Sequence, residues 1–97
     1  DAKLLNSAGV FSIVLECVET SLAKKITNTI SVPTIGIGAS QHCDGQILVT
    51  DDLIGLNPIN VKFVKKYSDI SRNISKAISD YSLDVKRKKF PNKKYSY

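Results

Sequence analysis

The stretch FSIVLECVE, residues 11–19, places one carboxylate, Glu16, at the end of a run of apolar side chains. Residues 11–16 predict a buried strand, because they are mostly aliphatic or aromatic and alternate along the chain. An unpaired charge in such surroundings loses several kcal/mol of hydration. Glu16 is therefore interpreted either as a strand-end carboxylate paired with a lysine or as a group that does chemistry.

Helix and strand patterns alternate after this first strand. Thr20 or Ser21 is expected to cap a helix whose apolar residues recur at helical spacing from Leu22 to Ile30. The run VPTIGIG, residues 32–38, predicts a second strand because β-branched residues alternate with glycine. The first part of the chain is thus expected to form a strand, a helix and a second strand in that order.

The next segment, residues 44–56, fits either a strand or a helix, and we expect a helix that Asp44 caps and Gly55 ends. Residues 61–66 then predict a short third strand, and residues 68–88 a long amphipathic helix. The apolar face of this last helix consists of Ile70, Ile74, Ala77, Ile78, Tyr81 and Val85.

The alternating order predicts an α/β fold with parallel strands and right-handed crossovers. In each of the first two strands one face is bulky, and the other is small or polar, which favours a barrel whose bulky face meets the outer helices. A closed barrel needs eight strands and roughly 250 residues, so the chain is expected to be a fragment. The alternative is a complete small α/β domain. The small face consists of Ser12, Val14, Glu16, Thr34, Gly36 and Gly38.

The net charge of +5 is concentrated at the C-terminal end. Residues 86–97 hold six of the fourteen basic residues and no acid, which leaves eight basic and nine acidic residues in 1–85, a net charge of about −1. Binding of nucleic acid through this tail would need stacking aromatics, of which it has Phe90, Tyr95 and Tyr97. No apolar run is long enough for a membrane helix and no signal peptide pattern is present, so a cytoplasmic protein is expected.

The cysteines and glycines are weaker candidates for a site. Cys17 and Cys43 are expected to be reduced, and together with His42 they lack the paired spacing of a zinc site. The segment GIGASQ, residues 36–41, has glutamine where a dinucleotide-binding loop has its last glycine. Gly36 and Gly38 indicate either a close approach of the backbone to a ligand or an opposing strand, or a tight turn.

Two further acidic residues are not expected to take part in a site. Asp51 and Asp52 are adjacent on the expected helix and therefore point in different directions, so both are expected to be solvated. They are not interpreted as a catalytic pair.

Three segments resemble the ketopantoate hydroxymethyltransferase family. They are residues 8–27, residues 31–58 and residues 62–91, which include LECV, PTIGIGA and CDGQILV in family order and at family spacing. The resemblance covers nearly all of this chain and about the last third of the family's usual length. It implies that residues 1–91 are the last three strand and helix units of a TIM-type (β/α)8 barrel of the phosphoenolpyruvate and pyruvate type, with 92–97 as a basic C-terminal tail.

The resemblance also implies a transferase of pantothenate biosynthesis. Such an enzyme moves a hydroxymethyl group from 5,10-methylenetetrahydrofolate to 3-methyl-2-oxobutanoate, with magnesium holding the oxo acid. The glutamate of LECV is the family's catalytic base, which falls on Glu16 and would remove the C3 proton. Apolar surroundings raise the pKa of a carboxyl group towards the operating pH, which suits a general base. The magnesium ligands and the lysine that grips the substrate lie upstream in the family, so none is assigned here.

Three positions depart from the family pattern, and they are Glu19, Ser40 and Asp51. Among these, Ser40 is expected to crowd the loop beside the site. The family's last helix helps to join subunits, so the resemblance implies a homo-oligomer through residues 70–85. The isolated chain is expected to be inactive as an enzyme. A remnant that serves as an interaction or assembly module, and a nucleic-acid-binding protein, are the alternatives.

Overall fold

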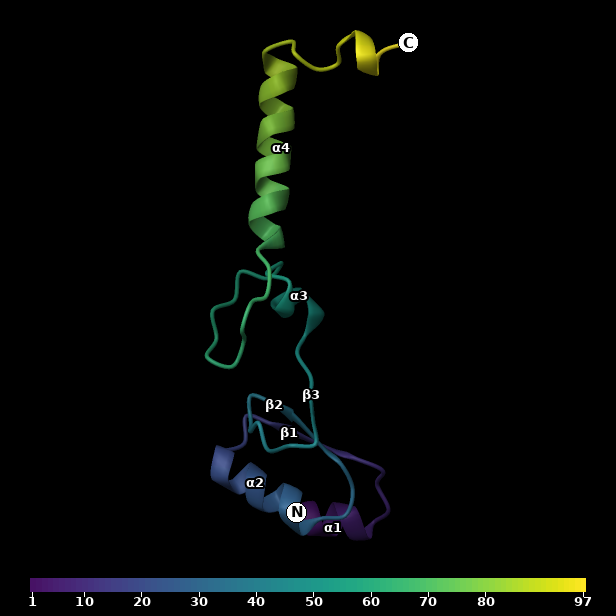
Figure 1. Cartoon of the computed structure of the whole chain (residues 1–97), viewed down its shortest axis with the longest axis vertical. Coiled ribbons are helices and arrows are strands. Elements are labelled where there is room, and N and C mark those ends of the chain that lie inside the picture. Colours follow the sequence, from purple (N-terminus) through teal and green to yellow (C-terminus); the bar gives the residue numbers. More distant parts are fainter.

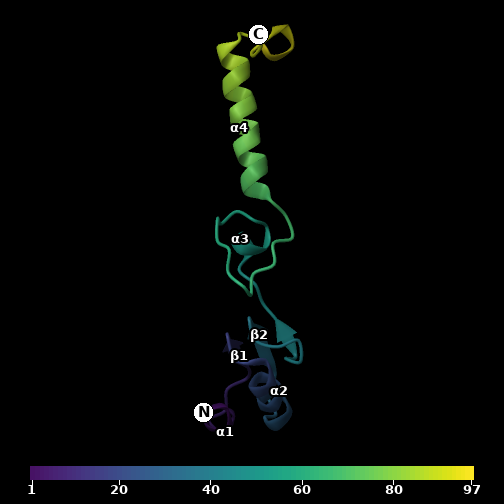
Figure 2. The same ribbon diagram turned by 90° about the vertical axis from the view of Figure 1, so that its left-hand side faces the viewer.

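The computed structural model describes residues 1–97 and has an elongated shape (Figure 1). Its principal extents are 68 × 27 × 16 Å and its radius of gyration is 22.4 Å, whereas a compact domain of 100 residues has a radius of gyration of about 13 Å. One end holds the strands with helices α1 (Ala2–Ser7) and α2 (Thr20–Thr29), and the long helix α4 (Ile70–Lys86) extends away from them. The view in Figure 2 shows the same separation.

The sheet has three parallel strands in the order β1 (Ile13–Glu16), β2 (Thr34–Ile37) and β3 (Gly45–Gln46). The first two lie where the sequence predicts strands, and the parallel pairing is confirmed. The expected third strand at residues 61–66 is wrong, because these residues form no strand. Three strands in an open order form a small parallel sheet, which is consistent with part of a barrel.

One face of the sheet packs against α2. Ile13 and Leu15 are buried on this face together with Ala23 of α2 and with Cys43. Nine of the 97 residues are buried, so this cluster is the only substantial core. The bulky side of β1 does face the helices, as predicted.

The prediction for the faces of β2 is wrong. Ile13 pairs with Thr34 and Leu15 pairs with Gly36, and residues paired in this way point to the same side of a sheet. The small residues of β2 therefore face α2, where the Thr34 hydroxyl lies 2.8 Å from that of Thr27. The bulky residues of β2 occupy the open face beside Val14 and Glu16.

The N-cap of helix α2 lies one residue before the expected caps. Its N-cap is Glu19, whose carboxylate accepts hydrogen bonds from the backbone N–H groups of Ser21 and Leu22, each at 3.1 Å. The Ser21 hydroxyl also donates to this carboxylate. The prediction that Thr20 or Ser21 caps the helix is therefore wrong, because the longer side chain reaches the same free N–H groups from one position earlier.

Residues 44–56 do not form the expected helix. Asp44 instead joins the start of β2, where its carboxylate accepts from the Thr34 N–H at 2.9 Å. The N–H of Ile47 donates to Gly36 at 3.0 Å, which extends the pairing of β3 with β2. Only the short helix α3 (Thr50–Leu53) is formed, and Gly55 follows it with a φ of 73° as predicted.

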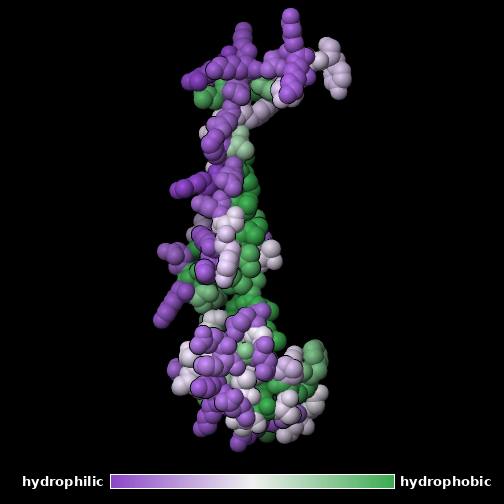
Figure 3. All heavy atoms as spheres, viewed as in Figure 1, coloured by the Kyte–Doolittle hydropathy of each residue, from purple (hydrophilic) through white to green (hydrophobic).

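Helix α4 confirms the long amphipathic helix, with ends two residues inside the predicted ones. Asp69 caps it by accepting from the N–H of Arg72. None of its residues is buried, and Figure 3 shows a continuous hydrophobic stripe along it. No helix of the chain is long and apolar enough to cross a membrane.

The C-terminal residues fold back against the end of α4. Phe90 packs edge-on against Tyr81 with ring centroids 5.8 Å apart, and Tyr95 lies 5.6 Å from Phe90. A single 3-10 turn, η1 (Lys93–Tyr95), lies within this segment. Two of the three aromatic rings in the basic tail are therefore engaged within the chain.

Candidate functional site

Glu16 is the last residue of β1 and pairs with Ile37 of β2. The pairing continues one residue further, because the N–H of Cys17 donates to Ile37 at 2.9 Å. Glu16 lies on the open face of the sheet, is exposed, and takes part in neither of the two salt bridges. Both the dry surroundings and the lysine partner expected from the sequence are thus absent within residues 1–97.

A groove of about 550 Å³ lies at the carboxyl ends of β1 and β2. It is lined by residues 17–20 after β1, residues 38–39 after β2, and Lys62 with Phe63 from the connection to α4. The carboxyl ends of parallel strands are where α/β folds bind their ligands. Glu16 is adjacent to the groove in sequence but does not line it.

Two residues with positive φ shape this groove. Cys17 has a φ of 52° and Gly38 a φ of 63°, so the chain turns sharply as each strand ends. A left-handed conformation is uncommon for a residue other than glycine and is found at functional sites. Cys17 is exposed and its thiol is free.

Phe63 packs directly over Gly38. A Cβ atom at Gly38 would lie 2.8 Å from the Cβ and Cγ atoms of Phe63, which is closer than nonbonded carbon atoms approach. Gly36 is also crowded, since a Cβ there would lie 3.0 Å from the Cys43 sulfur. The predicted close approach to a neighbouring strand is confirmed at Gly36, where a Cβ atom would also lie 3.0 Å from the side chain of Gln46 in β3. At Gly38 the positive φ fits the alternative, a tight turn.

The segment after Gly38 is braced by its own polar groups. Ser40 is buried, and its hydroxyl accepts from the N–H of His42 at 3.1 Å, while its carbonyl accepts from the Gln46 side chain at 2.6 Å. Ser40 therefore closes a turn through its hydroxyl and carbonyl groups. This turn sets the direction in which the chain passes from β2 to β3.

Asp52 corrects a further prediction. It is 8% exposed, and its carboxylate accepts from the Asn57 side chain at 2.8 Å. Asp51 is exposed, as expected. The two acids point in different directions and have different surroundings, so they form no catalytic pair.

Of the two charged side chains that line the groove, one is stabilised by hydrogen bonds and the other forms no salt bridge. Hydrogen bonds from the Ser21 hydroxyl and then from the N–H groups of Ser21 and Leu22 lower the pKa of Glu19 below its ordinary value of 4.5. Lys62 takes part in no salt bridge. The groove therefore contains a carboxylate bound to a helix N-terminus and an ammonium group without a carboxylate partner.

Residues 1–97 contain no metal-binding cluster, because no three His, Cys, Asp or Glu side chains come together. Cys43 is buried in the core, whereas Cys17 is exposed, so the two thiols and His42 form no ligand set. The donors on this chain do not fit a magnesium ion.

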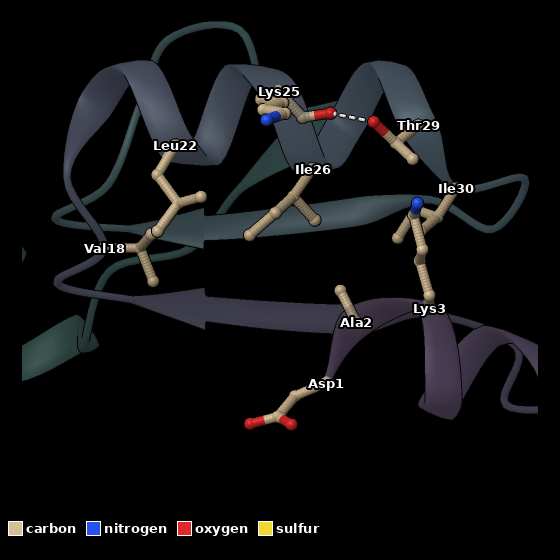
Figure 4. Close-up of a pocket in the computed structure, with 9 residues that line it drawn as sticks. All are labelled: Asp1, Ala2, Lys3, Val18, Leu22, Lys25, Ile26, Thr29 and Ile30. Carbon is tan, nitrogen blue, oxygen red and sulfur yellow. Dashed lines mark hydrogen bonds between the residues drawn. The ribbon is translucent and has the colours of Figure 1, made fainter.

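A second groove, of about 460 Å³, lies between α1 and α2. Figure 4 shows Ile26 pointing from α2 towards the strands, with Val18 and Leu22 at one end and Ala2 of α1 below. Its lining is largely aliphatic. It brings together no set of groups that resembles a catalytic site.

Sequence reasoning missed the contribution of Lys62 and Phe63, because residues 61–66 were interpreted as a strand. The signal that was available is the segment KFVKKY, residues 62–67, which holds three lysines and two aromatic residues and no acid. Such a composition is typical of a surface that meets anionic ligands.

Comparison with known proteins gives a match to one family over nearly the whole chain. Residues 1–93 match the family model described as ketopantoate hydroxymethyltransferase. The residues matched include β1 with Glu16, the groove, and all of α4.

Several relatives carry the same name, 3-methyl-2-oxobutanoate hydroxymethyltransferase. The protein from Pelagibacter ubique is 68% identical over 97 residues, which are 100% of this chain and 38% of that protein. The relatives from Carboxydothermus hydrogenoformans and Clostridium kluyveri are 52% and 53% identical over 98 residues, again across 100% of this chain, which covers 36% and 35% of their lengths. The chain thus spans little more than a third of the curated relatives that it matches.

Proposed function

The chain belongs to the ketopantoate hydroxymethyltransferase family, and from this we propose that residues 1–97 supply part of the active site of a 3-methyl-2-oxobutanoate hydroxymethyltransferase. The reaction transfers a one-carbon unit from 5,10-methylenetetrahydrofolate to the oxo acid, and water supplies the hydroxyl oxygen of 2-dehydropantoate. The observation that carries the proposal is the family match over residues 1–93, which includes a carboxylate at the carboxyl end of a parallel strand.

We propose Glu16 as the general base of this reaction. Its carboxylate takes the proton from C3 of 3-methyl-2-oxobutanoate, and the electrons of the broken C–H bond form the double bond of an enolate. The enolate carbon then bonds to the one-carbon unit of the folate. The bonds of that unit to N5 and N10 break, water supplies its hydroxyl group, and tetrahydrofolate leaves as the second product. A positioned base of this kind contributes a factor of about 10² to 10⁴ to the rate.

The surroundings of Glu16 must be completed by residues outside this sequence. The sheet is open at β1 and the carboxylate is exposed, so the proposed TIM-type (β/α)8 barrel of the phosphoenolpyruvate and pyruvate type requires further strands. Residues 1–91 are proposed as its last three strand and helix units, and 92–97 as a basic tail. The family's magnesium has no ligand set among residues 1–97, so no step of the reaction is assigned to it. A cytoplasmic location is proposed for the whole enzyme.

A graft tests the role of Glu16. Residues 1–97 replace the matching 97 residues of the Pelagibacter ubique relative, and exchange of the C3 hydrogen of 3-methyl-2-oxobutanoate for deuterium is followed by NMR. We expect the graft to exchange and Glu16→Gln to slow the exchange by at least about 100-fold. Asp80→Asn, which makes the same chemical change on α4, is the control and should retain the rate.

A Glu16→Gln graft that exchanges deuterium as fast as the parent graft would contradict the role of Glu16. Exchange by the free 97-residue chain that Glu16→Gln abolishes would overturn a separate expectation, that this chain alone has little or no activity.

The apolar face of α4 suggests the partner. We infer that this face packs against a second copy of the protein, because Ile74, Ile78 and Tyr81 are 45%, 63% and 59% exposed along one side of the helix. An amphipathic helix gains most of its stability from burial of such a face. A homo-oligomer formed through α4 is therefore part of the proposed function.

A further inference from the structure

The connection between α3 and α4 carries lysines and aromatic rings to the carboxyl ends of the strands. Phe63 borders two grooves, because it lines the one at the ends of β1 and β2 and also a neighbouring one of about 430 Å³. Lys62 lines the first groove and Lys65 lines the second. One aromatic ring thus separates two grooves, each of which has its own ammonium group.

The two ammonium groups are available to a ligand. Neither Lys62 nor Lys65 forms a salt bridge. The Lys65 Nζ atom lies 4.9 Å from the centre of the Tyr67 ring, which holds it beside the second groove. The one carboxylate that lines the first groove, that of Glu19, accepts hydrogen bonds at the N-terminus of α2. Anionic groups of a ligand would therefore meet uncompensated positive charge.

The aromatic ring is fixed in place and partly exposed. Phe63 is 38% exposed, and its side chain rests on Gly38. A ring held on one side by backbone and open on the other can stack with a second ring, as in many ligand sites. The ligand best suited to this arrangement has an aromatic ring that carries at least two carboxylates.

We propose that residues 62–65 form the subsite for the p-aminobenzoylglutamate part of the folate co-substrate. The benzoyl ring packs on Phe63, and the two carboxylates of the glutamate meet Lys62 and Lys65. This subsite rests on the proposed function, and it deepens that function by assigning the co-substrate to particular side chains. The oxo acid also has a carboxylate, but it has no ring that Phe63 would bind.

Binding of single probes to the graft tests the subsite without turnover. The probes are pteroylglutamate, pteroate, which lacks the glutamate, and 3-methyl-2-oxobutanoate, with backbone amide shifts as the readout. We expect pteroylglutamate to shift the amides of residues 61–67 and to bind about tenfold more tightly than pteroate. The double substitution Lys62→Gln with Lys65→Gln should remove this difference. Lys66→Gln is the matched control, because Lys66 lines neither groove.

The grafted enzyme supplies the second readout. The double substitution should raise KM for 5,10-methylenetetrahydrofolate about tenfold and leave KM for the oxo acid and kcat unchanged. A rise in KM for the oxo acid instead, or an equal effect of Lys66→Gln, would overturn the subsite. An inactive graft that still binds pteroylglutamate more tightly than pteroate would contradict the proposed reaction alone, whereas an active graft that is insensitive to Lys62 and Lys65 would contradict the subsite alone.

Discussion

Glu19 links the carboxyl end of β1 to the first turn of α2, and its charge has a defined effect on that turn. Hydrogen bonds from the Ser21 hydroxyl, the Ser21 N–H and the Leu22 N–H lower the pKa of Glu19 below 4.5. A lowered pKa means that the folded state favours the charged carboxylate, so its stabilisation is present above 4.5 and is lost as the pH falls through the folded-state pKa. We expect the amide signals of Ser21 and Leu22 to move together in that acid range.

A substitution identifies the group that titrates. Glu19→Gln keeps an oxygen acceptor and removes the charge, so the acid transition of the Ser21 and Leu22 amides should disappear. Asp51→Asn removes an exposed carboxylate from α3 and should leave the transition unchanged. The same acid shift in the Glu19→Gln chain would show that another group is responsible.

At the residue scale, the sequence predicted where Glu16 lies but not what surrounds it. The end of a strand follows from the local pattern of residues 11–16, and the structure confirms it. Burial depends on atoms that approach from distant parts of a chain, which neighbours in sequence cannot supply. The contact of Phe63 with Gly38 is of the same kind, because 24 intervening positions separate them and no local pattern links them.

At the scale of elements, the junction between α3 and α4 depends on Gly55. The N–H groups of Tyr67, Ile70 and Ser71 donate to the carbonyls of Leu53, Ile54 and Gly55. Gly55 has a φ of 73°, and a Cβ atom there would overlap the Ser68 carbonyl oxygen. The junction is thus built from backbone alone and has no space for a side chain.

We expect Gly55→Ala to open this junction. Positive φ and a clash with backbone together cost roughly 1 to 3 kcal/mol, so hydrogen exchange at Tyr67, Ile70 and Ser71 should accelerate by about tenfold or more. Gly9→Ala is the matched control, because Gly9 has a φ of 92° and no atom near its absent Cβ. Equal exchange in the parent and Gly55→Ala chains would contradict the role assigned to Gly55.

The error in residues 44–56 has a physical cause at this scale. From the sequence, Asp44 could equally well cap a helix or accept a hydrogen bond from a neighbouring strand. The apolar run Ile47 to Val49 is too short for its periodicity to distinguish a helix from a strand. In the structure the Asp44 carboxylate accepts from the Thr34 N–H and the Ile47 N–H donates to the Gly36 carbonyl, and these hydrogen bonds stabilise the strand conformation. The longer pattern of α4 extends over several turns, and it predicted that helix to within two residues at each end.

For the whole molecule, the shape agrees with the fraction of the relatives that it covers. The expectation of a fragment came from counting strands, and the chain spans 38% of the Pelagibacter ubique relative. An open edge at β1, few buried residues and a radius of gyration of 22.4 Å leave much apolar surface without a partner. A chain that buries so little surface depends on neighbours for stability. The spacing of apolar and polar residues within 1–97 predicts which faces are apolar, but it does not identify the segments that cover them.

Helix α4 allows the proposed neighbour, a second copy, to be tested. Ile78 lies on the apolar face and is 63% exposed, and burial of an isoleucine side chain contributes about 1.5 to 3 kcal/mol. Ile78→Lys should therefore weaken self-association by about tenfold to 100-fold, as measured by analytical ultracentrifugation over a range of concentrations. Ser79→Lys introduces the same charge one residue along, which turns it by about 100° towards the opposite face, so association should persist. Equal weakening by both substitutions would assign the effect to charge and not to the face of α4, and an unassociated parent chain would exclude the second copy as the partner of this helix.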